Sequence, residues 1–214
     1  MDTIKFVAKD QKQNDFAKEL SKRIRAYFKE TKKTTFGEGK MIVKAIIMIA
    51  IYLLPFVAIL VFDMSPWIAL LLAVVMGIGE AGIGMGVMHD AAHGSFSRHE
   101  WLNKLMANTM LLLGSSVVNW HVQHNVLHHT YPNVHEWDKD IDSTVLRLTS
   151  HAEHHHKVYR YQHLFGPFLY SLMTTARFVN DFAHLRMYKE MGALESSKIN
   201  YKKEMVNLFI SKAV

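Results

Sequence analysis

Cysteine is absent from the 214-residue chain. Its absence excludes disulfide bonds, thiolate-bound iron–sulfur clusters and thiolate nucleophiles, so any redox metal must be bound through nitrogen or oxygen. The first forty residues also lack a short apolar core followed by a small-residue cleavage site, and we therefore expect no secretory signal peptide. No internal repeat and no low-complexity tract is present.

Half of the residues are hydrophobic, and many of them are gathered into two long blocks. Residues 41–62, MIVKAIIMIAIYLLPFVAILVF, are apolar apart from Lys44. At about 1.5 Å per residue, this block matches the roughly 30 Å hydrocarbon core of a bilayer. Residues 67–88, WIALLLAVVMGIGEAGIGMGVM, have a similar length and one acid, Glu80. Only the turn at 63–66 separates the blocks, so the sequence predicts a transmembrane helical hairpin.

Basic residues are concentrated just before the first block. They are Lys22, Arg23, Arg25, Lys29, Lys32, Lys33 and Lys40. Because basic residues stay on the cytoplasmic side of a membrane, we expect the N-terminus and both ends of the hairpin to be cytoplasmic. The sequence pI is near 9.4. Topology and anionic lipid account for this charge, so we expect no nucleic-acid partner.

The pattern predicts an all-α membrane protein with four regions. These are a cytosolic or interfacial N-terminal helical region (1–40), the transmembrane hairpin (41–88), a histidine-rich region with an interfacial helix (89–157), and an interfacial and cytosolic helical tail (158–214). Residues 101–118 are apolar but interrupted by polar side chains. We expect them to lie in the interface, because a crossing would put the histidines before and after them on opposite sides of the membrane. Residues 161–179 are expected to form a surface-lying helix.

His89 and His93 lie at the cytoplasmic end of the second block. Residues four apart share one helical face, so the pair predicts two ligands for one metal. Stepping back along this stripe by three and four residues gives Val75, Gly79, Gly82 and Gly86. This ridge without large side chains allows either close helix packing or a groove for a ligand chain. Glu80 lies on the opposite face and is expected to be a hydrogen-bonded or protonated acid, not a ligand.

A second histidine cluster occurs in WHVQHNVLHHTYPN, residues 120–133. His124 and His128 share a helical face, and His129 is expected about 100° around the helix, facing a second metal or another side of the same one. Neutral imidazole suits zinc, copper, iron and nickel, so ligand type leaves the metal open. His121 is left out of the ligand set. His99, His135 and His184 are expected to be exposed polar residues.

The segments HDAAH and HNVLHHTYPN, placed after a membrane hairpin, resemble the histidine boxes of the membrane-bound fatty acid desaturase family, especially bacterial members related to linoleoyl-CoA and front-end desaturases. The likeness continues through DKDID at 138–142 and RYQH at 160–163 and covers most of the chain from residue 41. It implies a bacterial inner-membrane enzyme with a non-haem di-iron centre. Such an enzyme uses dioxygen to introduce a double bond into the fatty acyl chain of an acyl-CoA or acyl-lipid.

By motif position, the resemblance implies a set of iron ligands. They are His89, His93, His124, His128 and His129. Asp90 and Asn125 would orient the ligand rings. No HPGG-like haem motif is present, so the resemblance implies an external electron donor, either a ferredoxin or a haem electron carrier.

The sequence departs from the family in one respect. Family members carry a third box, HxxHH or QxxHH, after a second pair of spans, and neither feature is found in this sequence. Five box histidines are too few for two irons, so the resemblance implies the N-terminal portion of a desaturase, with little or no turnover by these 214 residues alone. Residues 151–155, HAEHH, match HxxHH but precede any second hairpin, and we expect no ligands there.

Two alternatives to a desaturase remain open. One is a related membrane di-iron hydroxylase or ketolase, which inserts oxygen and would be distinguished by its product. The other is a catalytically inactive membrane protein that binds metal through an incomplete site, which would be distinguished by an iron content well below two per chain.

Overall fold

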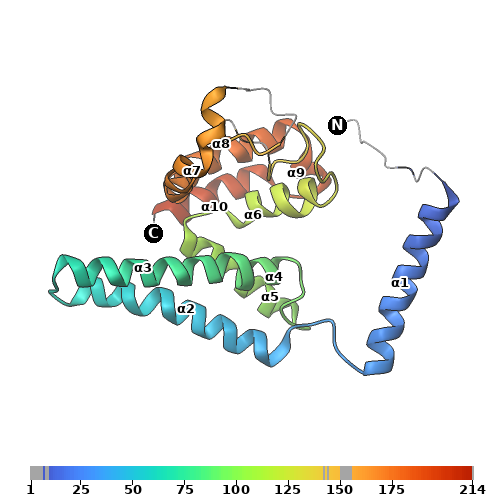
Figure 1. Ribbon diagram of the computed structural model, residues 1–214, viewed down its shortest axis with the longest axis horizontal. Coiled ribbons are helices and arrows are strands. Elements are labelled where there is room, and N and C mark those ends of the chain that lie inside the picture. Colours follow the sequence, from blue (N-terminus) through green and yellow to red (C-terminus); the bar gives the residue numbers. More distant parts are fainter. Residues whose placement is uncertain (1–6, 8–9, 142, 144, 150–155, 214) are drawn as a thin grey trace.

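The computed structural model describes residues 7, 10–141, 143, 145–149 and 156–213, and these contain helices and no strand. The helices form two layers (Figure 1). One layer is the hairpin of α2 (Glu38–Val61) and α3 (Pro66–Gly82), and the other contains the short helix α6 (Val117–Trp120) and the C-terminal helices. The segment 151–155 lies outside the described residues.

The hairpin agrees with the prediction, although its second helix runs further than expected. Two stretches are long and apolar enough to cross a membrane, Gly39–Val61 and Pro66–Ala92, with mean hydropathies of 2.6 and 2.1. Ser65 caps α3 by accepting a hydrogen bond from the Ile68 amide, and Pro66 occupies its first turn. Only 6% and 11% of the most apolar windows of these stretches are buried within the isolated chain, which is the arrangement expected where lipid covers the helices.

The glycine ridge of α3 packs against α2. A Cβ atom added to Gly79 would lie 2.7 Å from the Tyr52 backbone nitrogen, and one added to Gly82 would lie 2.3 Å from the Met48 sulfur. The ridge therefore serves helix packing here, which was one of the two alternatives left open by the sequence.

Residues 101–118 do not form one continuous helix. They comprise α5 (Glu100–Ala107), the 3₁₀ helix η2 (Asn108–Leu113) and the start of α6. Gly114 separates η2 from α6 with a φ of +67°, a left-handed conformation that glycine adopts without steric cost. A straight crossing by this segment is therefore excluded, and the chain turns back toward the first histidines.

The C-terminal half forms most of the second layer. It contains the 3₁₀ helix η4 (Lys157–Tyr161) and the helices α7 (Gln162–Ser171), α8 (Met173–Glu190), α9 (Ala193–Ser196) and α10 (Tyr201–Ala213). The segment 161–179 is helical, as expected, but it is divided at Leu172 into α7 and α8, and α8 continues to Glu190. A core of Val122, Leu127, Leu185, Tyr188, Leu194 and Leu208 packs the second histidine segment onto α8, α9 and α10.

A buried ion pair fastens the same layer together. The Lys212 ammonium lies 2.8 Å from Asp181, and the two side chains are 7% and 1% exposed. Asp181 also accepts a hydrogen bond from the Ser116 amide at 2.8 Å, at the start of α6. The C-terminal helices thus fix the start of the segment that carries the second histidine cluster.

The N-terminal helix α1 (Gln11–Thr31) stands away from both layers (Figure 1). Asp10 caps it by accepting a hydrogen bond from the Gln13 amide, and Lys32 ends it with a φ of +53°. None of its residues is buried.

Candidate metal centre

The first histidine box follows a change of helix type at the end of the second span. After α3, the chain forms the π-helix η1 (Ile83–Met88) and then the short helix α4 (His89–Ala92). The rings of His89 and His93 lie 4.6 Å apart between centroids. The two rings therefore lie side by side, as their spacing of four residues predicted.

Asp90 contacts both the first box and the first span. Its carboxylate lies 3.3 Å from His89 Nδ1 and 3.4 Å from the Lys44 ammonium. A Cβ atom at Gly86 would lie 3.0 Å from that ammonium, so the glycine leaves room for the lysine side chain. Asp90 thus contacts a box histidine, as the resemblance implied.

The second box lies on another π-helix, η3 (His121–His128). The His129 amide donates to the His124 carbonyl at 3.0 Å. This hydrogen bond spans five residues, so the π-helical pattern continues to His129. Consequently His129 Nε2 lies 3.3 Å from His124 Nε2. An α-helix would have placed His129 about 140° around the axis from His124, so the π-helical winding brings together two rings that an α-helix would separate.

The two boxes meet. The ring of His124 lies 5.2 Å from that of His89 and 5.4 Å from that of His93, and His129 lies 4.8 Å from His93. One ring nitrogen of His89, one of His93 and one of His124 lie within 4.8 Å of one another. Nitrogens on one ion are at most about 4.2 Å apart, because each metal–imidazole bond is about 2.0–2.1 Å. Small side-chain adjustments would therefore allow the three rings to bind a common ion.

Two carboxylates accept hydrogen bonds from histidines of the second box. Asp140 lies 2.5 Å from His124 Nδ1, and Asp138 lies 2.8 Å from His128 Nδ1. An ionised carboxylate only accepts hydrogen bonds, so each Nδ1 carries the proton and each Nε2 keeps a lone pair for a metal. His124, His128 and Asp140 also form a second group of potential ligands within 4.8 Å of one another.

Asp138 is held as a carboxylate by donors from three directions. Burial raises the pKa of Asp138, but hydrogen bonds from the Asn133 amide, from His128 and from the Asp140 amide outweigh it, so the pKa lies below its usual value. Asn133 adopts a φ of +61°, which asparagine tolerates better than most residues. This turn reverses the chain after the second box and returns Asp138 to His128.

Protonation of the central rings is disfavoured. The pKa of His93 is lowered to about 4, chiefly because neighbouring groups desolvate its ring and then because His89, His129 and His124 would repel its charge. His93 is nevertheless an exposed residue in the isolated chain. Desolvation and repulsion by His124 and His128 also lower the pKa of His129. Neutral rings at physiological pH are the form that binds metals.

Trp120 forms a wall of the cluster. Its ring stacks on His124 at 4.6 Å and meets His89 and His93 edge-on at 5.9 Å. The residue is 9% exposed. Trp120 therefore excludes water from one side of the rings and limits their rotation.

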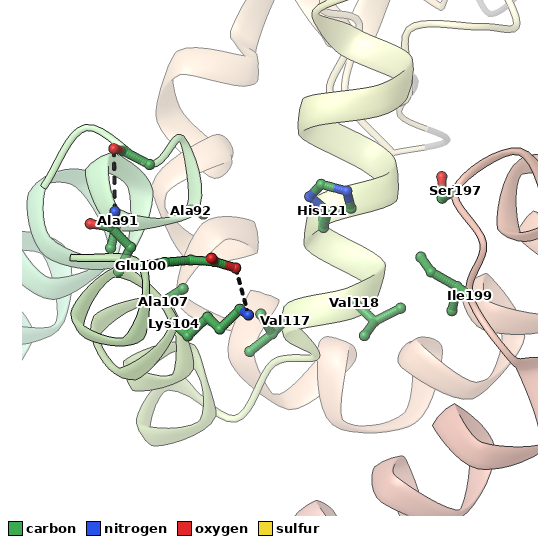
Figure 2. Close-up of a pocket in the computed structure, with 12 residues that line it drawn as sticks. Ala91, Ala92, Glu100, Lys104, Ala107, Val117, Val118, His121, Ser197 and Ile199 are labelled. Atoms are coloured by element: carbon green, nitrogen blue, oxygen red, sulfur yellow. Dashed lines mark hydrogen bonds and ion pairs between the residues drawn. The ribbon is translucent and has the colours of Figure 1, made fainter. Parts of the chain in front are cut away.

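Asn125 joins the two boxes through side-chain hydrogen bonds that involve none of the five box histidines. Its side-chain amide donates to the Ala92 carbonyl at 3.0 Å and lies 3.2 Å from His121 Nδ1. His121 faces a cavity of about 430 Å³ between α4, α5, α6 and the segment after α9 (Figure 2). None of the five box histidines lines this cavity, so His121 faces a different space from their cluster.

The remaining predicted residues have separate locations. Glu80 is half-buried and accepts a hydrogen bond from Thr174 at 3.1 Å, so the expectation of a hydrogen-bonded acid is confirmed. His99 and His135 are exposed, as predicted. The prediction for His184 is wrong, because it is half-buried and lines a cavity of about 610 Å³ beside α7 and α8.

Sequence reasoning assigned no role to Asp138 and Asp140. A signal was available, because metal-binding histidines almost always donate their second ring nitrogen to a carboxylate, carbonyl or water. The DKD segment begins nine residues after the last box histidine. A turn at the intervening TYPN could therefore have been expected to return these acids to the rings.

The structure has two apolar helices long enough to cross a bilayer, and five imidazoles cluster at the end of the second. These features define an α-helical membrane protein with a site suited to metal. Comparison with known proteins gives the family. The model of the fatty acid desaturase family matches residues 65–205. The chain therefore belongs to the fatty acid desaturase family, as the histidine boxes indicated.

Several curated relatives are desaturases. The chain is 32% identical over 155 residues to the sn-1 linoleoyl-lipid 6-desaturase of Arthrospira platensis, covering 72% of this chain and 42% of that protein. It is 29% identical to the acyl-lipid (8-3)-desaturase of Physcomitrium patens, covering 81% and 37%. It is 32% identical to the probable Delta(5) fatty acid desaturase C of Dictyostelium discoideum, covering 80% and 38%. The chain thus spans about two fifths of these relatives, and no solved structure matches it.

Proposed function

We propose that this chain provides the iron-binding region of a fatty acid desaturase, with His89, His93, His124, His128 and His129 as ligands. The observation that carries the proposal is the meeting of the two boxes, with rings from different segments 4.8 to 5.4 Å apart at the end of a membrane span. Membership of the desaturase family and the names of the relatives support the reaction.

The donor set fits non-haem iron. It consists of imidazole nitrogens backed by carboxylates, with no cysteine in the chain to favour a softer metal. Bound iron would supply the activation of dioxygen needed to remove two hydrogens from an unactivated acyl chain. Asp138 and Asp140 hold His128 and His124 in the tautomer that presents Nε2, and Trp120 shields the rings from water on one side.

The position of the site suits a substrate that comes from the bilayer. Both boxes are continuous with, or packed against, the end of the stretch Pro66–Ala92, so an acyl-lipid or acyl-CoA would need to move its chain only a short way out of the lipid. The basic residues before α2 favour a cytoplasmic location for this end, in a bacterial inner membrane. Electrons would come from a separate ferredoxin or haem carrier.

Iron binding is tested on the full 214-residue chain in lipid nanodiscs, purified anaerobically with ferrous iron. We expect bound iron that is lost in His124→Ala and retained in His135→Ala, whose exposed ring lies outside the cluster. Equal iron in all three proteins would contradict the proposed ligand set.

The reaction is tested in a chimaera that joins this chain to the remaining part of the Arthrospira platensis relative. Supplied with reduced ferredoxin, dioxygen and labelled acyl-lipid, it should form a product lighter by two hydrogens. The same chimaera carrying His124→Ala should form none. A hydroxylated product, or no product from an iron-loaded chimaera, would refute the desaturase assignment.

A further inference from the structure

The N-terminal helix α1 carries an apolar stripe that no other described residue buries. Phe16, Leu20, Ile24 and Tyr27 follow one another at spacings of four, four and three, so they share one face of the helix. Their exposed fractions are 69%, 45%, 49% and 48%. An exposed stripe of this size on a helix that stands apart from the protein marks an interaction surface (Figure 1).

Charge indicates what covers the stripe. Between residues 11 and 33 there are eight lysines or arginines and three acidic residues. Lys18, Lys22 and Arg25 lie on the side of the helix opposite the stripe, by their spacing from Leu20. An apolar face combined with a basic polar face is typical of helices that lie in the interface of an anionic bilayer.

The connection to the first span brings α1 to the membrane. Residues 32–37 are the only link between the end of α1 and the start of α2, and six residues reach at most about 20 Å. The link is also fixed to the body of the protein, because the Gly37 amide donates to the Ser95 carbonyl at 2.9 Å. The end of α1 therefore stays within reach of the bilayer surface that its apolar face fits.

We propose that α1 lies flat on the cytoplasmic leaflet, with the stripe of Phe16, Leu20, Ile24 and Tyr27 inserted among the acyl chains and anionic headgroups attracting its basic face. This inference is independent of the proposed enzyme activity. Lipids with a net negative headgroup are the recognised partner, and zwitterionic lipids alone would hold the helix less well.

The absence of cysteine permits a direct test on the full chain. Leu20→Cys and Lys22→Cys each introduce a single thiol for a nitroxide label, on the stripe and on the opposite face of the same turn. Collision of the nitroxide with dissolved oxygen is more frequent in lipid, and collision with a water-soluble nickel chelate is more frequent in water. In bilayers containing phosphatidylglycerol, we expect the label at position 20 to favour oxygen and the label at position 22 to favour nickel.

The outcomes separate the possible occupants. In bilayers of phosphatidylcholine alone, the label at position 20 should shift toward nickel, and in Lys18→Gln the preference for anionic bilayers should fall roughly fivefold. Access of nickel to both labels in anionic bilayers would overturn the proposal, because the helix would then lie in water. Shielding of position 20 from both reagents would also overturn it, since a protein surface or a second copy would then cover the stripe. Equal immersion in both lipids would overturn the role of charge.

Discussion

Replacement of Asp138 by asparagine tests how the second box is held. The carboxylate is 1% exposed and accepts from His128 Nδ1 at 2.8 Å, from the Asn133 amide at 2.7 Å and from the Asp140 amide at 3.2 Å. Asparagine keeps the shape but turns one acceptor into a donor. That donor must face either the Asn133 amide or the His128 ring, and both of these donate in the native protein.

The expected result follows from this conflict. If His128 becomes the acceptor, its proton moves to Nε2 and the ring can no longer bind metal. Loss of such a supporting carboxylate weakens metal binding about ten- to hundredfold, or roughly 1.4 to 2.7 kcal/mol. The assay is an anaerobic titration of ferrous iron into the detergent-solubilised chain against a competing chelator. Asp63→Asn, at the exposed hairpin turn, is the matched control and should bind as the wild type does.

An iron affinity for Asp138→Asn within twofold of the control, with an unchanged unfolding temperature, would refute the reasoning. It would mean that His128 presents Nε2 without help from the carboxylate. A fall in unfolding temperature without a change in affinity would assign Asp138 to the fold of the turn alone.

Three further predictions concern the fold and its pH dependence. Gly79→Val should destabilise the chain by about 1–3 kcal/mol and lower its unfolding temperature, because its Cβ would lie 2.7 Å from the α2 backbone. Gly77→Ala, which has open space around it, should leave the unfolding temperature unchanged. Lys212→Met should destabilise the chain by about 3–5 kcal/mol by leaving Asp181 buried without its cation, and the double variant with Asp181→Leu should recover part of the loss in chemical denaturation. The pKa of His93 is lowered from 6.5 to about 4, so the unfolded state takes up this proton more readily than the native state. The free energy of unfolding of the metal-free chain should therefore decrease as the pH is lowered from about 6.5 to about 4. In His93→Gln, this dependence of stability on pH should be weaker.

The sequence predicted the parts of the fold that depend on composition along one segment. The two apolar blocks predicted the hairpin, since their length and hydrophobicity alone match a bilayer. The spacing of His89 and His93 predicted their pairing. The boundary of the second span was less accurate, because the helix continues through η1 to Ala92.

The geometry of the second box was beyond sequence reasoning. An α-helix and a π-helix differ by one hydrogen-bond step, and the choice between them in η3 depends on packing against α8, α9 and α10, which are 45 or more residues away along the chain. The contact of His129 with His124 follows from that choice. The support from Asp138 depends on a left-handed turn at Asn133, which periodicity does not reveal and which only the turn-forming residues TYPN could have indicated.

The central claim is that imidazoles from both boxes bind a common metal ion, and a double-mutant cycle between His93 and His124 tests it most directly. Ferrous iron affinity is measured for the wild type, for each alanine variant and for the double variant. Ligands of one ion should show a coupling of about 0.5 to 3 kcal/mol, with the second substitution costing less than the first. Additive losses would contradict the claim, because they would place the two rings at independent sites.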